Sequence, residues 1–270
     1  MDFLGKLHEW TFEMPEKYGL FHISFLLLTF FITAILIIFL KNCREKTMKW
    51  IVFIAWFILV AFEIVKQFMM AYKYDHLEYA WGSLPFQFCE MPLYVFPILL
   101  IVKNKKFQHA LITFISTYVF FAGFALMVNP DRLFSIRIFL SVRTMVQHGI
   151  QVIIGLFLFA WDRENINIKT FLQGTIIFIV LTLIAILINS TLGKAKALEY
   201  QVNMFWISKD YDTNLMILKR IKPEVPYFVF VLSYLFGFGF CAICSLLVEY
   251  IFFELCDWIG SAAERRRMSY

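Results

Sequence analysis

The stretch LPFQFCEMPLYVFPILLI, residues 84 to 101, combines features that do not belong to one ordinary transmembrane helix. Its second half is apolar enough to enter a bilayer, yet its three prolines prevent an unbroken helix. Gln87, Cys89 and Glu90 stand among these prolines. Irregular backbone at membrane depth is tolerated only where it faces protein or a polar cavity. The stretch therefore predicts a broken span that presents polar groups to the interior of a membrane protein.

The composition of the whole chain agrees with a membrane location. Of the 270 residues, 61% are hydrophobic and 17% are charged, and the mean hydropathy is +0.72. A soluble domain of this length carries roughly a quarter charged residues. The net charge of +5 falls in clusters between apolar runs, which favours membrane phospholipids over nucleic acid as partners. We therefore predict an all-α, multi-pass protein of the cell membrane.

Apolar run length predicts about seven transmembrane helices. A hydrocarbon core of ~30 Å needs ~20 apolar residues in a helix. No repeat or linker divides the chain, so residues 1–270 are expected to form a single transmembrane domain with a long outer loop at 191–225. The end of that loop, residues 214–226, predicts either a short interfacial helix or a plain solvated loop. The predicted spans are about 19–40, 50–72, 86–102, 107–128, 138–160, 170–190 and 226–253.

Basic residues in the short loops predict the orientation. Cytoplasmic loops carry an excess of Lys and Arg, and in a seven-span arrangement the basic loops all lie on one side. The N-terminus is then outside, the C-terminus is cytoplasmic, and residues 84–92 open on the outer face. These basic residues are Lys41, Arg44, Lys46, Lys49, Lys103, Lys105, Lys106, Arg163, Lys169, Arg265, Arg266 and Arg267.

Two predicted spans carry polar residues along one helical face. An ionisable side chain in a lipid-facing helix costs several kcal/mol, so such residues usually face the interior. The two stripes favour either a structural clasp, with Glu63 facing Arg143 or Lys66, or a polar cavity open from the outer leaflet. The stripe in the second span is Glu63, Lys66 and Gln67, and that in the fifth is Thr144, Gln147, His148 and Gln151, with Arg143 at its edge.

Cys89 is the candidate nucleophile, because a thiol accepts an acyl group once a base or a cation favours its thiolate. His148 is the candidate base and Arg143 the stabilising charge. Glu90 is read either as a member of this site or as a surface carboxylate. At ~1.5 Å per residue, Cys89 lies ~5 Å inside its predicted span and His148 ~15 Å inside its own, so the two differ in depth. Taken alone, a lone cysteine is more often a packing residue.

The motif W-x-x-L-P-x-Q-x-C-E resembles the signature of the YwaF-like integral membrane proteins, a bacterial family related to eukaryotic transmembrane protein 164. Family-like positions also occur at Asn129-Pro130-Asp131, at His148-Gly149 and at Asn203, so that the resemblance covers about residues 60 to 230. The motif residues here are Trp81, Leu84, Pro85, Gln87, Cys89 and Glu90.

This resemblance implies a seven-span fold and, from the eukaryotic branch, acyl transfer onto lysophospholipid through an acyl-cysteine at the position of Cys89. The eukaryotic proteins keep a His directly after that Cys, whereas this chain has Glu90.

Three functions therefore compete. The first is a phospholipid acyltransferase or transacylase, in which Cys89 takes the acyl chain, His148 moves protons, and Gln87, Arg143 and Gln147 hold the carbonyl or phosphate. The second is a transporter or a lipid-binding protein with a site made of Glu63, Lys66, Arg143 and His148. The third is a structural subunit. No phosphate-binding Gly loop or HExxH-type spacing occurs, so we expect neither a metal nor a cofactor.

Overall fold

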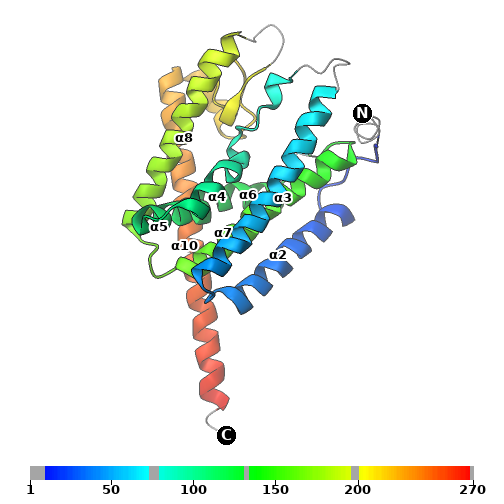
Figure 1. The fold of residues 1–270 in the computed structure, drawn as a ribbon. Helices are drawn as coiled ribbons and strands as arrows, with labels where there is room; N and C mark the ends of the chain where they lie inside the picture. The colour runs from blue at the N-terminus through cyan, green and yellow to red at the C-terminus, as the bar shows by residue number, and fades with distance from the viewer. Residues whose placement is uncertain (1–9, 73–78, 131–133, 196–200, 268–270) are drawn as a thin grey trace.

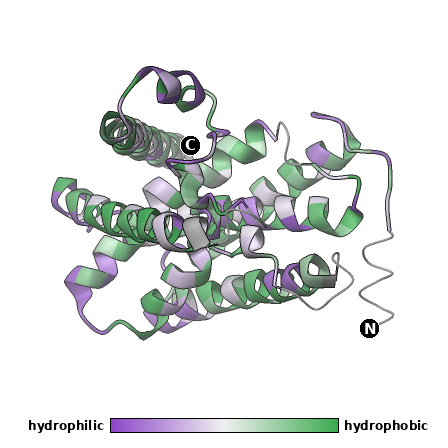
Figure 2. Ribbon diagram, turned by 90° about the horizontal axis from the view of Figure 1, so that it is seen from above, coloured by the Kyte–Doolittle hydropathy of each residue, from purple (hydrophilic) through white to green (hydrophobic). Residues whose placement is uncertain are grey.

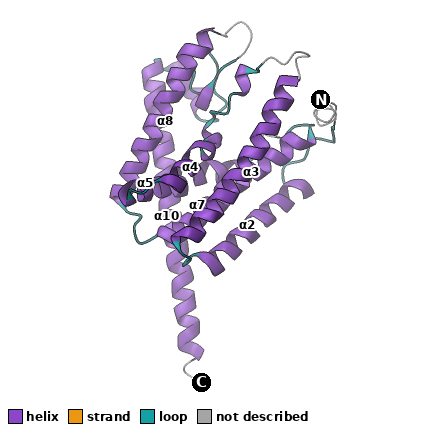
Figure 3. Cartoon of the chain, viewed as in Figure 1, coloured by secondary structure: helices purple, strands orange, loops and turns teal. Residues whose placement is uncertain are grey.

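The computed structural model describes residues 10–72, 79–130, 134–195 and 201–267, and these are mostly helical (Figures 1 and 3). Among them, the helices long and apolar enough to cross a membrane number six, which confirms the predicted all-α, polytopic class. They are α2 (Leu20–Leu40), α3 (Glu45–Tyr72), the continuous run of α5 (Lys105–Phe114), η3 (Ile115–Val119) and α6 (Phe120–Val128), α7 (Ile138–Asp162), α8 (Ile168–Ala195) and α10 (Tyr227–Arg267).

Apolar residues cover most of the length of these helices, and polar residues gather mainly in the segments that connect them (Figure 2). Six of the seven predicted spans therefore correspond to long helices. The last of them is longer than predicted, because α10 continues past the other helices to Arg267. The remaining elements are short: η1 (Trp81–Ser83), η2 (Phe88–Glu90), α4 (Pro92–Ile101), η4 (Met204–Trp206), α9 (Leu218–Ile221) and η5 (Lys222–Glu224).

The third predicted span, residues 86–102, is broken as its prolines predicted. It consists of the single turn η2 followed by α4, which has 10 residues. At ~1.5 Å per residue, α4 is ~15 Å long, about half of the hydrocarbon core. Pro92 lies in the first turn of α4, where its missing N–H removes no helical bond. The span therefore cannot be counted as one continuous transmembrane helix.

This broken segment nevertheless follows α3 from one end to the other. Near the end of α3, the Gln67 Nε2 donates to the Ser83 carbonyl at 2.7 Å, and further down Lys66 meets Glu90 at 3.0 Å. At the start of α3, Lys105 contacts Glu45. Residues 83–105 therefore run antiparallel to α3 along its whole length, and the seven-crossing path stays a prediction that this arrangement favours.

Pro97 lies inside α4 and leaves one backbone acceptor without its helical donor. The group affected is the Leu93 carbonyl, four residues earlier. The indole Nε1 of Trp56 on α3 donates to this carbonyl at 3.0 Å. A neighbouring helix thus satisfies the backbone group that the proline frees, as the membrane interior requires.

We expect Trp56→Phe to lower the free energy of unfolding by about 1 kcal/mol, because the Leu93 carbonyl loses this donor inside the membrane. Thermal unfolding of the purified protein in detergent measures the change. Trp50→Phe is the matched control on the same helix, since the Trp50 side chain is exposed. Equal losses of unfolding free energy in the two variants would show that the bond from Trp56 to the Leu93 carbonyl does not stabilise the fold.

The predicted basic loops lie together at one end of the bundle. The Trp161 Nε1 at the end of α7 donates to the Cys43 carbonyl at 2.9 Å, and Lys105 contacts Glu45. His109 on α5 contacts Asp162 on α7 at 2.7 Å. The loops expected on the cytoplasmic side are therefore neighbours, while the orientation itself stays a prediction. The side chains of Arg265, Arg266 and Arg267 lie outside the described part.

The predicted outer loop forms a cap at the opposite end from the basic loops. Asn189 on α8 holds this cap through two hydrogen bonds to the backbone of Met204, of 3.0 and 2.7 Å. Phe205 is buried and stacks on Phe86 with ring centroids 5.7 Å apart. Within residues 214–226, α9 and the 3-10 turn η5 form a short helical segment, which favours the predicted short helix, while its interfacial position stays a prediction.

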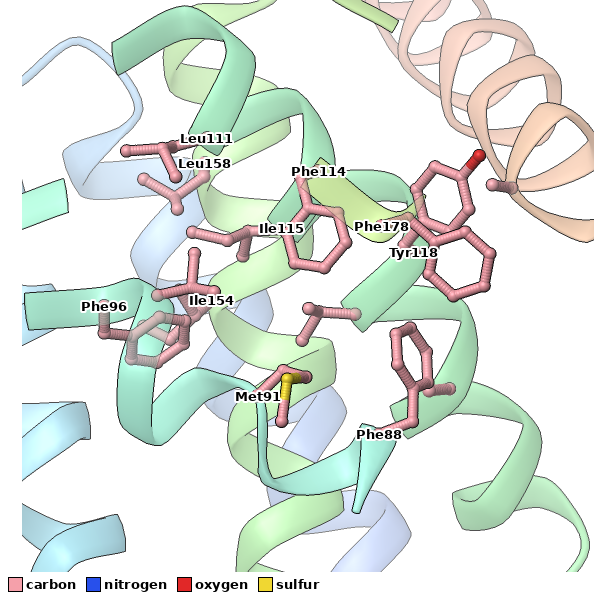
Figure 4. Packing of buried hydrophobic residues seen from close by; sticks show 14 of the residues in the cluster. Phe88, Met91, Phe96, Leu111, Phe114, Ile115, Tyr118, Ile154, Leu158 and Phe178 are labelled. Atoms are coloured by element: carbon pink, nitrogen blue, oxygen red, sulfur yellow. The ribbon is translucent and has the colours of Figure 1, made fainter. Parts of the chain in front are cut away.

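The aromatic core fixes the direction of the turn that carries Cys89. Phe88 is buried and contacts the rings of Phe178 on α8, Phe205 in the cap and Phe238 on α10, with centroids 5.5, 5.4 and 5.1 Å apart. Figure 4 shows Phe88 and Met91 among the buried side chains of this core. With Phe88 anchored there, the next residue, Cys89, lines a pocket between α3 and α7.

Candidate functional site

Four charged side chains from three segments form one ion cluster inside the bundle. Lys66 Nζ lies 2.9 Å from Glu63 Oε1 and 3.0 Å from Glu90 Oε1. Arg143 Nη2 contacts Glu63 and lies 3.0 Å from Glu90 Oε1. Each cation thus touches both carboxylates. The exposed fractions of the four side chains are 5 to 13%, so the whole cluster is withdrawn from the surroundings.

The cluster is formally neutral, because two cations meet two carboxylates. Removing charges from water is expensive, and only mutual pairing of this kind offsets the cost. The structure brings Glu63 against both partners that the sequence allowed, Arg143 and Lys66. Glu90 is buried at the centre of the cluster and is not a surface carboxylate. Its second oxygen accepts the backbone N–H of Gln87 at 2.9 Å, which closes the turn η2.

Two glutamines of α7 hold the backbone of Cys89. The Gln147 Nε2 donates to the Cys89 carbonyl at 2.8 Å, and the Gln151 Nε2 donates to the same oxygen. Both glutamines are buried. Because Gln147 and Gln151 flank His148 along α7, Cys89 lies at the level of His148. The difference in depth expected from span boundaries is therefore wrong.

A small pocket joins Cys89 to the ion cluster. Its lining includes Cys89, Glu63, Glu90, Arg143 and Gln147, and its volume is about 10 Å³. That is roughly the space of one water molecule. Five of the predicted site residues therefore line one pocket, and this pocket has no room for an acyl chain in this conformation. The pocket lining does not include Gln87, Lys66, Thr144, His148, Gln151 or Asn203.

His148 is buried but does not line this pocket. Its Nδ1 bonds the Thr144 carbonyl at 2.8 Å, and since a carbonyl only accepts, Nδ1 carries the proton. The Nε2 then is an acceptor, and it has no hydrogen-bond partner among the described residues. His148 is not part of the pocket lining. The predicted pairing of Cys89 with His148 stays a prediction.

Gln87 faces the cap. Its Nε2 donates to the Asn203 carbonyl at 2.9 Å, while its Oε1 is buried without a partner in the described structure. The side chain of Asn203 organises the cap itself, because it donates to the Asp212 carbonyl and accepts the Ser208 N–H. Asn203 therefore reaches the turn η2 through its backbone. Asp131, another family-like position, lies outside the described residues.

The TMEM164 family model matches residues 17–248, which is most of the chain. The chain belongs to the TMEM164 family. This match confirms the resemblance to transmembrane protein 164, whereas the YwaF-like branch stays a prediction. Neither the curated proteins nor the solved structures contained a match. Family membership, together with six long apolar helices in the described part of the chain, gives this TMEM164-family protein a membrane location. The cell membrane in particular stays a prediction.

One residue of this TMEM164-family chain was not singled out from its sequence. Glu249 on α10 is 1% exposed, and neither of its carboxylate oxygens has a hydrogen-bond partner among the described residues. The signal was present, because an acidic residue within a predicted span marks a functional site or a structural cost. Because Glu249 is a single acidic residue in an apolar run, it forms no polar stripe of the kind that marks the second and fifth predicted spans.

Proposed function

We propose that this TMEM164-family protein is a membrane acyltransferase or transacylase that moves an acyl chain between phospholipids through a thioester on Cys89. The observation that carries the proposal is the pocket that Cys89 shares with Glu63, Glu90 and Arg143. A nucleophile, two proton acceptors and a cation for the developing oxyanion thus line one space.

The charge balance of the pocket supports thiolate formation. When the Cys89 thiol passes its proton to Glu63 or Glu90, the cluster keeps two cations, one carboxylate and the new thiolate, so the local charge remains zero. Arg143 then is the cation that lines the same pocket as the sulfur. We propose these carboxylates, in place of His148, as the proton acceptor, because they line the pocket and His148 does not.

The proposed reaction has two steps. In the first, the Cys89 sulfur attacks the ester carbonyl carbon of the donor phospholipid, a C–S bond forms, the ester C–O bond breaks, and the lysophospholipid oxygen takes the proton from the carboxyl group. In the second, the hydroxyl of an acceptor lysophospholipid attacks the thioester, and its proton passes through the same carboxylate to the departing Cys89 sulfur. No oxidant or cofactor is needed.

A structural role is the second candidate, because every charge of the cluster is already paired. The same pairing leaves no free charge for a transported ion, which disfavours the transporter.

The test is acyl transfer to the purified protein in nanodiscs that contain phospholipid with isotope-labelled acyl chains. We expect a hydroxylamine-labile acyl group on the peptide that contains Cys89. Cys89→Ser should lose it completely, and Cys241→Ser, a cysteine within α10, should keep it. His148→Asn should also keep it if a cluster carboxylate is the proton acceptor.

Full cellular function of Cys89→Ala, together with loss of function in Glu63→Ala, would overturn the enzymatic proposal and favour the structural role. In that case the labelled protein should carry no thioester at any cysteine.

A further inference from the structure

A second hollow lies against Glu63, on the face of α3 that is exposed at the surface of the helix bundle. It is a shallow groove of about 290 Å³ between α3 and the start of α4. Its walls are mostly apolar side chains, with Val60, Ile64 and Phe68 from α3 and Leu93 from α4. Sites for small molecules begin at roughly 300 Å³, so this groove has the size of one short ligand segment.

The groove faces the surroundings of the bundle. Ile64 is 50% exposed and Phe68 is 53% exposed, and both lie on a helix long and apolar enough to cross a membrane. In a bilayer, the medium at such positions is hydrocarbon. From Val60 to Phe68 the groove follows α3 for about 12 Å.

The groove adjoins the pocket of Cys89, because Glu63 and Leu93 line both hollows. These two side chains therefore form a wall that the groove shares with the thiol pocket. The polar groups beside the groove are already hydrogen-bonded. Gln67 Nε2 donates to Glu63 at 2.6 Å and to the Ser83 carbonyl at 2.7 Å, and the Tyr94 hydroxyl donates to the Pro85 carbonyl at 2.7 Å.

We propose that this groove binds one acyl chain of a bilayer phospholipid and delivers its ester end to the wall formed by Glu63 and Leu93. The inference deepens the proposed function and rests on it for the identity of the reacting group. Because the polar side chains beside the groove bond to each other and to the backbone, the groove recognises the hydrocarbon chain and not the headgroup. The acyl chain therefore enters between α3 and α4.

The test measures binding without chemistry. Cys89→Ala protein is placed in vesicles of phosphatidylethanolamine and phosphatidylglycerol that contain phosphatidylethanolamine with a diazirine on one acyl chain. After irradiation, peptides are mapped by mass spectrometry. We expect label within residues 60–68 and at residues 93–94.

Ile64→Trp should fill the groove and reduce this label about tenfold, because an added ring leaves no space for a chain. The matched control is Ile54→Trp, an equally exposed isoleucine on the same helix outside the groove, which should leave the label unchanged. Thermal unfolding checks that both variants fold, and Ile64→Phe is the smaller replacement if Ile64→Trp does not.

Label that is spread evenly along α3, or that survives Ile64→Trp, would overturn the groove as a binding site. Because the protein in this experiment lacks the Cys89 thiol, the result does not depend on catalysis. Groove labelling without any thioester in the wild-type protein would refute the enzymatic proposal and leave the chain-binding site standing. A thioester on Cys89 without groove labelling would refute the chain-binding site and leave the enzymatic proposal standing.

Discussion

Arg143→Met is expected to lower the free energy of unfolding by about 3–5 kcal/mol. The variant leaves the carboxylates of Glu63 and Glu90 with Lys66 as their single remaining cation. Both carboxylates are less than 10% exposed, so water cannot replace the lost charge. Thermal and denaturant unfolding in detergent, followed by tryptophan fluorescence, measures the loss.

A second substitution tests whether charge balance is the cause. Arg143→Met combined with Glu63→Gln restores one cation to one carboxylate, and it should recover most of the lost stability. The control is Arg163→Met at the end of α7, whose partners Glu254 and Asp257 are 72% and 54% exposed. An exposed pair contributes at most about 1 kcal/mol. If Arg143→Met lowers the free energy of unfolding no more than Arg163→Met does, the ion cluster does not contribute the stability expected of buried charges.

Glu249→Leu is expected to act in the opposite direction and to stabilise the protein by about 1–3 kcal/mol. The carboxyl group of Glu249 is buried without any described hydrogen-bond partner, and leucine of similar size removes the polar atoms. Glu249 faces the core on the same side of α10 as Phe253, which stacks on Phe159 with centroids 5.4 Å apart. The unfolding temperature of the variant should rise.

Glu254→Leu provides the comparison, because Glu254 lies on the same helix but is largely exposed and paired with Arg163. It should change stability little. A lower unfolding temperature for Glu249→Leu would mean that the carboxyl group binds something essential to the fold.

The long helices were predictable because their apolar runs exceed the thickness of the bilayer. The prolines of residues 84–101 also predicted the break in the third span. Hydropathy could not show how that break is built, because Trp56 supplies the missing donor from another helix. Hydropathy also set the end of the last span at residue 253, because it follows the apolar run alone. The helix α10 continues beyond that run to Arg267.

Within the site, the stripe pattern allowed Glu63 to face Arg143 or Lys66, and the structure shows both contacts. The position of Glu90 was left open, since its place in a 3-10 turn cannot be read from helical periodicity. Depth along an ideal helix placed Cys89 at another level than His148, whereas Gln147 and Gln151 on either side of His148 both bond the Cys89 carbonyl. The unpaired state of Glu249 depends on what surrounds it, which no pattern along one helix reveals.

The broken third segment also bears on how the chain is inserted into the bilayer. Its helical half is too short to partition alone, and its backbone relies on donors from two other helices. Trp56 of α3 bonds the Leu93 carbonyl in the helical half, and Gln147 and Gln151 of α7 bond the Cys89 carbonyl in the irregular half. Helix α7 is synthesised later than residues 84–101. The segment therefore cannot reach its final place during its own translocation, and it settles only after the downstream helix has arrived to receive it.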